Sequence, residues 1–161
     1  MSYALPFLFE AAAQKYKWQG RCLALSLVGE FARSAPGQTK RAIPEIIPGL
    51  SQFMGDARKE VSAAAEASLL TVCGVVNNKD IEPFIPTLVS CIARPEEVAE
   101  CVYKLSSTTF VQAVEPPTLA IIMPVLERGL KERAIATIRK VAVIIDNMCK
   151  LVEVRAVQRA A

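Results

Sequence analysis

The sequence predicts an all-α fold, an α–α superhelix of about four helix pairs, and two observations support this prediction. First, a short motif recurs around Pro48, Pro86 and Pro124, so that each copy follows the previous one by 38 residues. In each copy an aliphatic residue or Met precedes the proline, and a leucine follows two positions later. A fixed period in this range is typical of solenoids built from stacked helix pairs. Second, no segment has the alternating pattern of a strand bounded by hairpin turns.

The first helix pair is predicted over residues 4–34. Apolar residues at helical spacing indicate a helix over 4–14, and a polar turn follows it. A second helix over 18–33 ends before Pro36 and Gly37, because proline blocks continuation and glycine favours a helix C-terminus.

The second pair is predicted over residues 39–76. Its first helix, 39–54, carries Pro48 in its interior, where the missing N–H should bend the helix. Its second helix, 57–76, has an apolar face rich in alanine. Alanine on that face predicts a close approach between helices.

The third pair is predicted over residues 80–112. Asp80 is an expected N-cap for a helix over 81–93 that carries Pro86. The next helix begins after Glu96-Glu97 and runs to about Phe110, although the serines and threonines before Phe110 are weak helix formers.

The fourth pair is predicted over residues 117–154. Glu115-Pro-Pro117 opens its first helix, which ends near Gly129, and the second helix spans about 132–154. The last helix is expected to be buried on two sides, with Ile144 and Leu151 on one of them. The residues expected on the other face are Ile138, Val141, Ala142, Ile145, Cys149 and Val152.

Helix pairs of about 38 residues, with prolines in the first helices and alanine-rich second helices, are typical of a HEAT-repeat solenoid. Residues 1–161 are therefore expected to form a single HEAT-repeat domain. Each pair would bury its apolar face against its neighbours. The predicted pairs are residues 4–34, 39–76, 80–112 and 117–154.

The composition excludes several classes of protein. Hydrophobic residues make up 52% of the 161 and charged residues 22%, which argues against disorder. The net charge of +3 permits a nucleic-acid partner without requiring one. No apolar run is a convincing membrane span and the N-terminus lacks a signal-peptide pattern, so a cytoplasmic protein with no membrane partner is expected. The odd number of cysteines, five, indicates buried thiols in a reducing compartment.

Catalytic motifs are missing from the sequence. With no histidine, the chain lacks Ser-His-Asp and Cys-His arrangements and most kinds of zinc site. No glycine-rich loop is followed by Lys-Ser or Lys-Thr, so there is no phosphate-binding P-loop. The acidic pair Glu96-Glu97 is better explained by a helix N-terminus than by acid–base chemistry. We expect no catalytic residue, metal site, cofactor or small-molecule substrate in this chain, and binding is the remaining option.

Several segments are more specific than generic HEAT sequence. In their order and spacing they resemble the N-terminal HEAT domain of translation elongation factor 3, a ribosomal ATPase, or a close relative. The resemblance covers about residues 4–153, but 134–138 and 154–161 depart from the family pattern. The chain is therefore expected to be a fragment of a longer protein or a divergent gene product. The segments are Lys17-Trp18-Gln19, Asn78-Lys79-Asp80-Ile81-Glu82 leading into Phe84-Ile85-Pro86, Thr108-Thr109-Phe110-Val111, and residues 142–153.

The resemblance implies a ribosome-binding HEAT arm that contacts rRNA and proteins of the small-subunit head and other domains of its parent. Cassettes elsewhere in the parent would use ATP and Mg to promote release of deacylated tRNA from the E site. The parent would be an ATPase, whereas this chain would not be an enzyme. The alternative is a HEAT scaffold for protein–protein contacts, which includes the ribosome-associated activator of the amino-acid-starvation kinase.

The candidate ribosome- and RNA-contact residues are cations near the turns between helices, because a solenoid exposes its turns along an edge. A competing interpretation pairs each cation with a nearby acid, as Asp56 with Lys59 or Asp146 with Lys150. Trp18 is expected to be half-buried under the first turn rather than to anchor a partner. The candidate cations are Lys15, Lys17, Arg21, Arg58, Lys59, Lys131, Arg133, Arg139 and Lys140.

Overall fold

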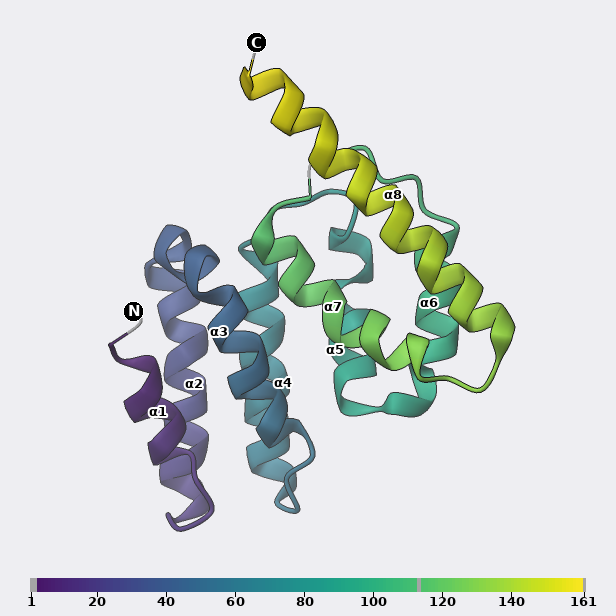
Figure 1. The fold of residues 1–161 in the computed structure, drawn as a ribbon. Coiled ribbons are helices and arrows are strands. Elements are labelled where there is room, and N and C mark those ends of the chain that lie inside the picture. Colours follow the sequence, from purple (N-terminus) through teal and green to yellow (C-terminus); the bar gives the residue numbers. More distant parts are fainter. Residues whose placement is uncertain (1–2, 113, 161) are drawn as a thin grey trace. The chain divides into compact units, whose positions relative to one another are not determined.

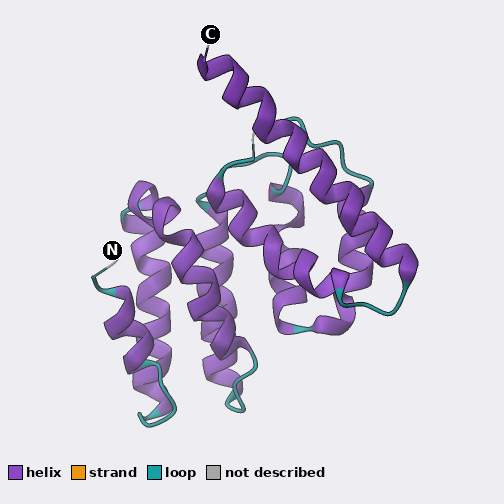
Figure 2. Ribbon diagram, in the orientation of Figure 1, coloured by secondary structure: helices purple, strands orange, loops and turns teal. Residues whose placement is uncertain are grey.

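The computed structural model describes residues 3–112 and 114–160 and consists of helices joined by loops, with no strand among those residues (Figure 2). The prediction of an all-α fold is confirmed. Contacts group the chain into two compact units, residues 1–77 and 78–161. The boundary falls between the second and third predicted helix pairs, so each unit holds two of the pairs.

The described part of the first unit has two helix pairs (Figure 1). In each pair the second helix returns beside the first, so that α1 contacts α2 and α3 contacts α4. The most extensive contact joins the two second helices, α2 and α4. The helices are α1 (Leu5–Ala11), α2 (Trp18–Ser34), α3 (Pro36–Met54) and α4 (Lys59–Gly74).

Small residues bring α2 and α4 together, as the alanine-rich face predicts. A Cβ atom added at Gly29 on α2 would lie 3.3 Å from Oγ of Ser68 on α4. The Ser68 hydroxyl donates a 2.9 Å hydrogen bond to the Leu25 carbonyl. The buried polar group on α4 is thereby satisfied, and the two backbones can approach closely.

The boundary between α2 and α3 is tighter than predicted. Ala35 ends α2 and also precedes α3, which begins at Pro36 rather than at Thr39. Proline fits the first position of a helix because the N–H that it lacks has no partner there. Pro36 therefore stops α2 and starts α3 with no intervening loop.

The described part of the second unit also has two pairs (Figure 1). As in the first unit, the second helices, α6 and α8, contact each other, and so do the first helices, α5 and α7. Short 3₁₀ helices precede α5 and α6. The elements are η1 (Glu82–Phe84), α5 (Ile85–Ala93), η2 (Pro95–Glu97), α6 (Val98–Ser106), α7 (Pro116–Leu130) and α8 (Ile135–Ala160).

The repeated prolines all lie in α-helices, although not at equal depth. Pro48 and Pro124 are inside α3 and α7, and Pro86 is the second residue of α5, because the first turn before it is 3₁₀. Pro48 and Pro86 are exposed and Pro124 is half-buried. The equal spacing therefore marked the first helix of each pair without fixing where that helix begins.

The predicted helix to Phe110 is wrong in its second half, since α6 ends at Ser106. Asp80 does not cap a helix with its side chain, contrary to the prediction. Its carboxylate instead accepts hydrogen bonds from the backbone N–H of Val111 at 2.8 Å and of Gln112 at 2.6 Å. The Gln112 amide oxygen accepts a bond of 2.8 Å from the Lys79 N–H. These bonds hold the segment after α6 as a loop, where weak helix formers have other partners.

The buried face of α8 differs from the predicted one. Ala142 and Cys149 are exposed, Ile145 is half-buried, and Val152 lies outside the described side chains. Only one face of the described part is buried, so the prediction of burial on two sides is wrong for these residues. The buried stripe consists of Thr137, Val141, Ile144 and Met148.

No helix in the described ranges has the length and apolar character needed to cross a bilayer.

Candidate nucleic-acid interface

Two turns of the first unit meet at one end of its helices. The α1–α2 turn carries Lys15, Tyr16 and Lys17, and the α3–α4 turn carries Arg58. The Arg58 guanidinium lies 5.1 Å from the centre of the Trp18 ring at the start of α2. We call Lys15, Tyr16, Lys17, Trp18, Arg58 and Lys59 the two-turn surface.

Arg21 does not belong to this surface, and its prediction as a contact residue is corrected here. Its side chain is only 7% exposed and forms an ion pair with Asp56. Its Nε also donates a 2.7 Å hydrogen bond to the Ala12 carbonyl. A guanidinium held by these two acceptors is unavailable to a partner, so Arg21 joins the two turns instead.

Asp56 is the other half of this junction. Its second carboxylate oxygen accepts a 2.9 Å hydrogen bond from the Arg58 backbone N–H. The hydrogen bond from Arg21, together with that from the Arg58 N–H, holds the pKa of the Asp56 carboxyl below its ordinary value of 3.8. Asp56 is therefore charged at neutral pH, and the suggested pairing with Lys59 is replaced by pairing with Arg21.

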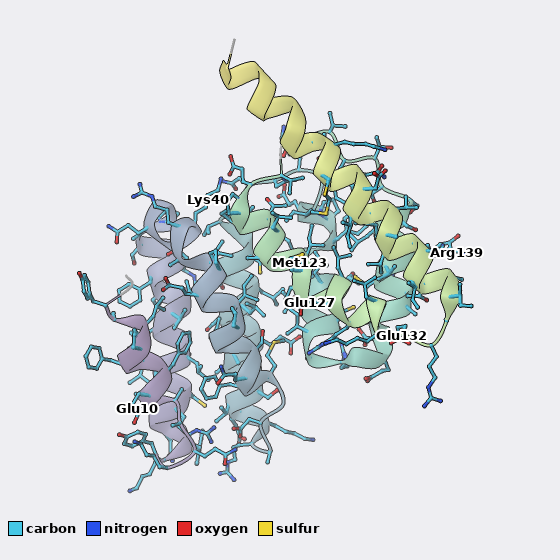
Figure 3. All side chains as sticks on the ribbon, in the orientation of Figure 1. Glu10, Lys40, Met123, Glu127, Glu132 and Arg139 are labelled. Atoms are coloured by element: carbon cyan, nitrogen blue, oxygen red, sulfur yellow. The ribbon has the colours of Figure 1, made fainter. Side chains whose placement is uncertain are left out.

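A pocket of about 480 Å³ opens beside the same two turns. Arg21 and Asp56 form part of its wall, and the rings of Phe9 and Phe53 stack beside it with their centroids 6.4 Å apart. Glu10, labelled in Figure 3, lies on its rim and pairs with Lys15. The full lining is Pro6, Phe9, Glu10, Ala13, Gln14, Arg21, Gln52, Phe53 and Asp56.

The second unit carries the remaining candidate cations. Lys131 and Arg133 are exposed in the α7–α8 loop, and Arg139 projects from the outer side of α8 (Figure 3). Lys140 is half-buried, and its ammonium lies 3.6 Å from the centre of the Tyr103 ring. These four residues lie in the loop before α8 and in the first two turns of that helix.

The candidate cations differ in whether they have an acidic partner. Lys15 pairs with Glu10, and Arg58 lies 3.8 Å from Glu60, but both pairs are exposed to solvent and therefore weak. Five candidates are exposed and form no ion pair with any residue that the structure describes: Lys17, Lys59, Lys131, Arg133 and Arg139.

The competing interpretation, in which a cation pairs with a nearby acid, holds for one predicted pair on α8. There Lys150 pairs with Asp146 at 2.5 Å, as predicted, and neither residue is among the candidate cations.

Sequence reasoning missed the aromatic partners of the cations. Lys15 lies 5.2 Å from the centre of the Tyr16 ring, and Tyr103 supports Lys140. The alternation Lys15-Tyr16-Lys17-Trp18 carried the signal in the first turn. Tyr103 had no comparable signal, because it meets Lys140 only when α6 packs on α8. The half-buried packing of Trp18 is as predicted.

Among residues 3–112 and 114–160, no three His, Cys, Asp or Glu side chains gather closely enough to hold a metal ion.

Two family models match the chain. Residues 1–69 match the EF3 N-terminal HEAT repeat, and residues 96–160 match the Elongation factor 3/GNC1 HEAT repeat. The chain belongs to the elongation factor 3 HEAT-repeat family. The predicted resemblance is thereby confirmed, and HEAT repeats act by presenting extended binding surfaces rather than by catalysis.

Individual relatives agree with this assignment. The chain is 53% identical over 149 residues to Elongation factor 3 of Phytophthora infestans, and 50% identical to Elongation factor 3A of Saccharomyces cerevisiae. It is 48% identical to Elongation factor 3 of Candida albicans. Each match covers 92% of this chain but only 14% of the relative. The chain thus corresponds to a small part of these translation factors.

Proposed function

We propose that this chain is the ribosome-binding arm of an elongation factor 3-type translation factor. The observation that carries the proposal is the set of exposed turn cations without an acidic partner in the described part, on a chain of this family. Lys17 and Lys59 represent this set in the first unit, and Arg133 and Arg139 represent it in the second.

Phosphate groups of ribosomal RNA are the partners that suit these cations. A cation that no acid neutralises can replace the counterions of a phosphate, and their release drives binding. Since the net charge is only +3, the isolated chain should bind modestly. Contacts with proteins of the small-subunit head and with other domains of the parent would supply the rest.

The longer parent would hold the chemistry. The family resemblance implies cassettes that bind ATP and Mg and whose hydrolysis promotes release of tRNA from the E site. In this scheme the present chain is a cytoplasmic binding element that contributes affinity and orientation and no catalytic group.

The test is cosedimentation of the chain with small ribosomal subunits across a salt series. We expect the variant Lys17→Glu/Lys59→Glu to bind more weakly and with a shallower salt dependence. Each lost phosphate contact should reduce the log–log slope by about 0.7–0.9. The matched control is Arg33→Glu/Arg41→Glu, which makes the same change of net charge far from the two turns. Arg33 lies near the end of α2 and Arg41 near the start of α3. This control should bind small subunits more tightly than Lys17→Glu/Lys59→Glu does.

Arg133→Glu/Arg139→Glu tests the second unit in the same way, with helicity checked by circular dichroism for every variant. Equal losses in the control and the test variant would mean that net charge alone acts. If the unmodified chain fails to bind at low salt, the ribosome proposal is wrong, and a HEAT scaffold for proteins becomes the better explanation.

A further inference from the structure

The pocket beside the two-turn surface combines features that the proposed function does not use. Its volume of about 480 Å³ is within the range of pockets that hold small molecules. It lies where the two turns meet, beside the cations of the two-turn surface. We propose that this pocket receives an unpaired base of an RNA strand, while the cations of the two-turn surface hold the flanking phosphates. This inference rests on the proposed function and specifies which part of an RNA is recognised.

The lining of the pocket suits a flat heteroaromatic ring. Phe9 and Phe53 are half-buried, and their rings are inclined by only 23°, so they present an aromatic wall. Gln14 and Gln52 are exposed side chains on the lining, and each amide offers both a donor and an acceptor. Aromatic faces for stacking and amides for the base edge are the groups with which proteins read unpaired RNA bases.

The cations of the two-turn surface lie beside the pocket, whose own charged lining residues are Glu10, Asp56 and Arg21. Lys15 pairs with Glu10 of the lining. The Arg58 backbone N–H bonds to Asp56 of the lining, while the Arg58 guanidinium lies over the Trp18 ring beside the pocket. Lys17 is adjacent and has no acidic partner in the described part of the chain. The two carboxylates of the lining, Glu10 and Asp56, are offset by Lys15 and Arg21, so Lys17 adds positive charge that no described acid balances.

The pocket is held in shape before any ligand arrives. Arg21 and Asp56 tie the two turns together through the buried ion pair. The far end of the Phe9 ring packs against Gly49 of α3, where an added Cβ atom would lie 2.3 Å from the ring. A pocket formed in advance needs little ordering on binding, which favours affinity.

An unpaired base fits better than a duplex or an acidic peptide. In an A-form duplex the bases are stacked and unavailable to a pocket, so only the cations of the two-turn surface could act. An acidic peptide would use the cations and leave the aromatic wall and the amides without a role. Only a single strand uses all three features at once.

The experiment measures binding of a fluorescein-labelled, uridine-rich RNA 12-mer to the full chain by fluorescence anisotropy. The same length of RNA duplex is the comparison, and we expect the single strand to bind at least tenfold more tightly. Trp18 is the only tryptophan of the chain and belongs to the two-turn surface, so its fluorescence should change with the single strand.

Gln14→Ala/Gln52→Ala should weaken single-strand binding about tenfold, the loss of about two hydrogen bonds, and leave duplex binding unchanged. The matched control is Gln19→Ala/Gln38→Ala, two exposed glutamines of the same unit outside the pocket, and it should bind like the unmodified chain. Because all four side chains are exposed, these variants should retain their helicity.

Equal binding of single strand and duplex, or no effect of Gln14→Ala/Gln52→Ala, would overturn the pocket inference. Competition by free nucleoside monophosphates as strong as by RNA would assign the pocket to a free nucleotide and overturn it too. A different outcome separates the pocket inference from the proposed function. If Lys17→Glu/Lys59→Glu loses small-subunit binding while the glutamine variant does not, the ribosome arm stands and the base pocket falls.

Discussion

Replacing Arg21 by methionine tests the junction that shapes the two-turn surface. The change removes the cation from a pair whose side chains are only 7% and 6% exposed. Asp56 then keeps a single hydrogen bond, from the Arg58 N–H, and the Ala12 carbonyl loses its 2.7 Å bond. Breaking a buried pair from one side costs about 3–5 kcal/mol, because the remaining charge is left without a partner.

We expect a value near the lower limit, about 3 kcal/mol, since the neighbouring pocket lets water reach Asp56. For a unit of this size, that loss lowers the melting midpoint by more than about 10 °C. Urea unfolding followed by Trp18 fluorescence measures it, because this single tryptophan packs in the first unit.

The control is Arg33→Met, which removes an arginine from the same helix. Its pair with Glu30 is exposed by 60% and 58%, so the expected cost is within about 0.5 kcal/mol. Adding Asp56→Asn to Arg21→Met should recover part of the lost stability, since it removes the orphaned charge. Equal costs for Arg21→Met and Arg33→Met would refute the assignment of a buried, structural role to Arg21.

Three further predictions concern the stability of α8, the acid range of Asp56 and the reactivity of the cysteines. Ile144→Ala should destabilise the chain by about 2–5 kcal/mol, because it leaves a cavity in the core. Val143 is 52% exposed, so Val143→Ala should cost about 0.5 kcal/mol or less. Thermal unfolding followed by circular dichroism measures both. Because the pKa of Asp56 is lowered in the folded chain, its contribution to the free energy of unfolding is fully present above about pH 3.8 and is lost as the pH falls below that value. The variant Asp56→Asn should therefore lose less stability over this acid range than the unmodified chain. The exposed Cys149 should react with a thiol reagent in the folded chain before Cys73, since burial raises the pKa of Cys73 to about 12, and equal rates would contradict the assigned burial.

The all-α fold and its pairing follow from the sequence, since periodicity is a local property. The equal spacing of Pro48, Pro86 and Pro124 marks first helices because stacked pairs repeat the same local geometry. The end of α6 and the role of Asp80 were not readable in this way. The Asp80 carboxylate bonds to residues about thirty positions later in the chain, and no local pattern encodes such a partner.

The buried face of a helix was harder to predict than the helix itself. α8 has enough apolar residues to form more than one apolar stripe. Packing against α6 and α7 buries the stripe that contains Val141, Ile144 and Met148. Ile145 sits beside this stripe and is half-buried. A helix rotated by one residue turns by about 100°, which is enough to exchange inner and outer positions.

The sequence by itself determined that cations gather at the turns, because turns are where the repeat places polar residues. Only the tertiary structure decided their roles, since charge energetics depend on distance and burial rather than on order along the chain. Arg21 and Lys17 read alike in sequence. Folding brings Asp56 and the Ala12 carbonyl to Arg21 and makes it part of the interior, whereas Lys17 meets no acid within the described residues and remains available to a partner.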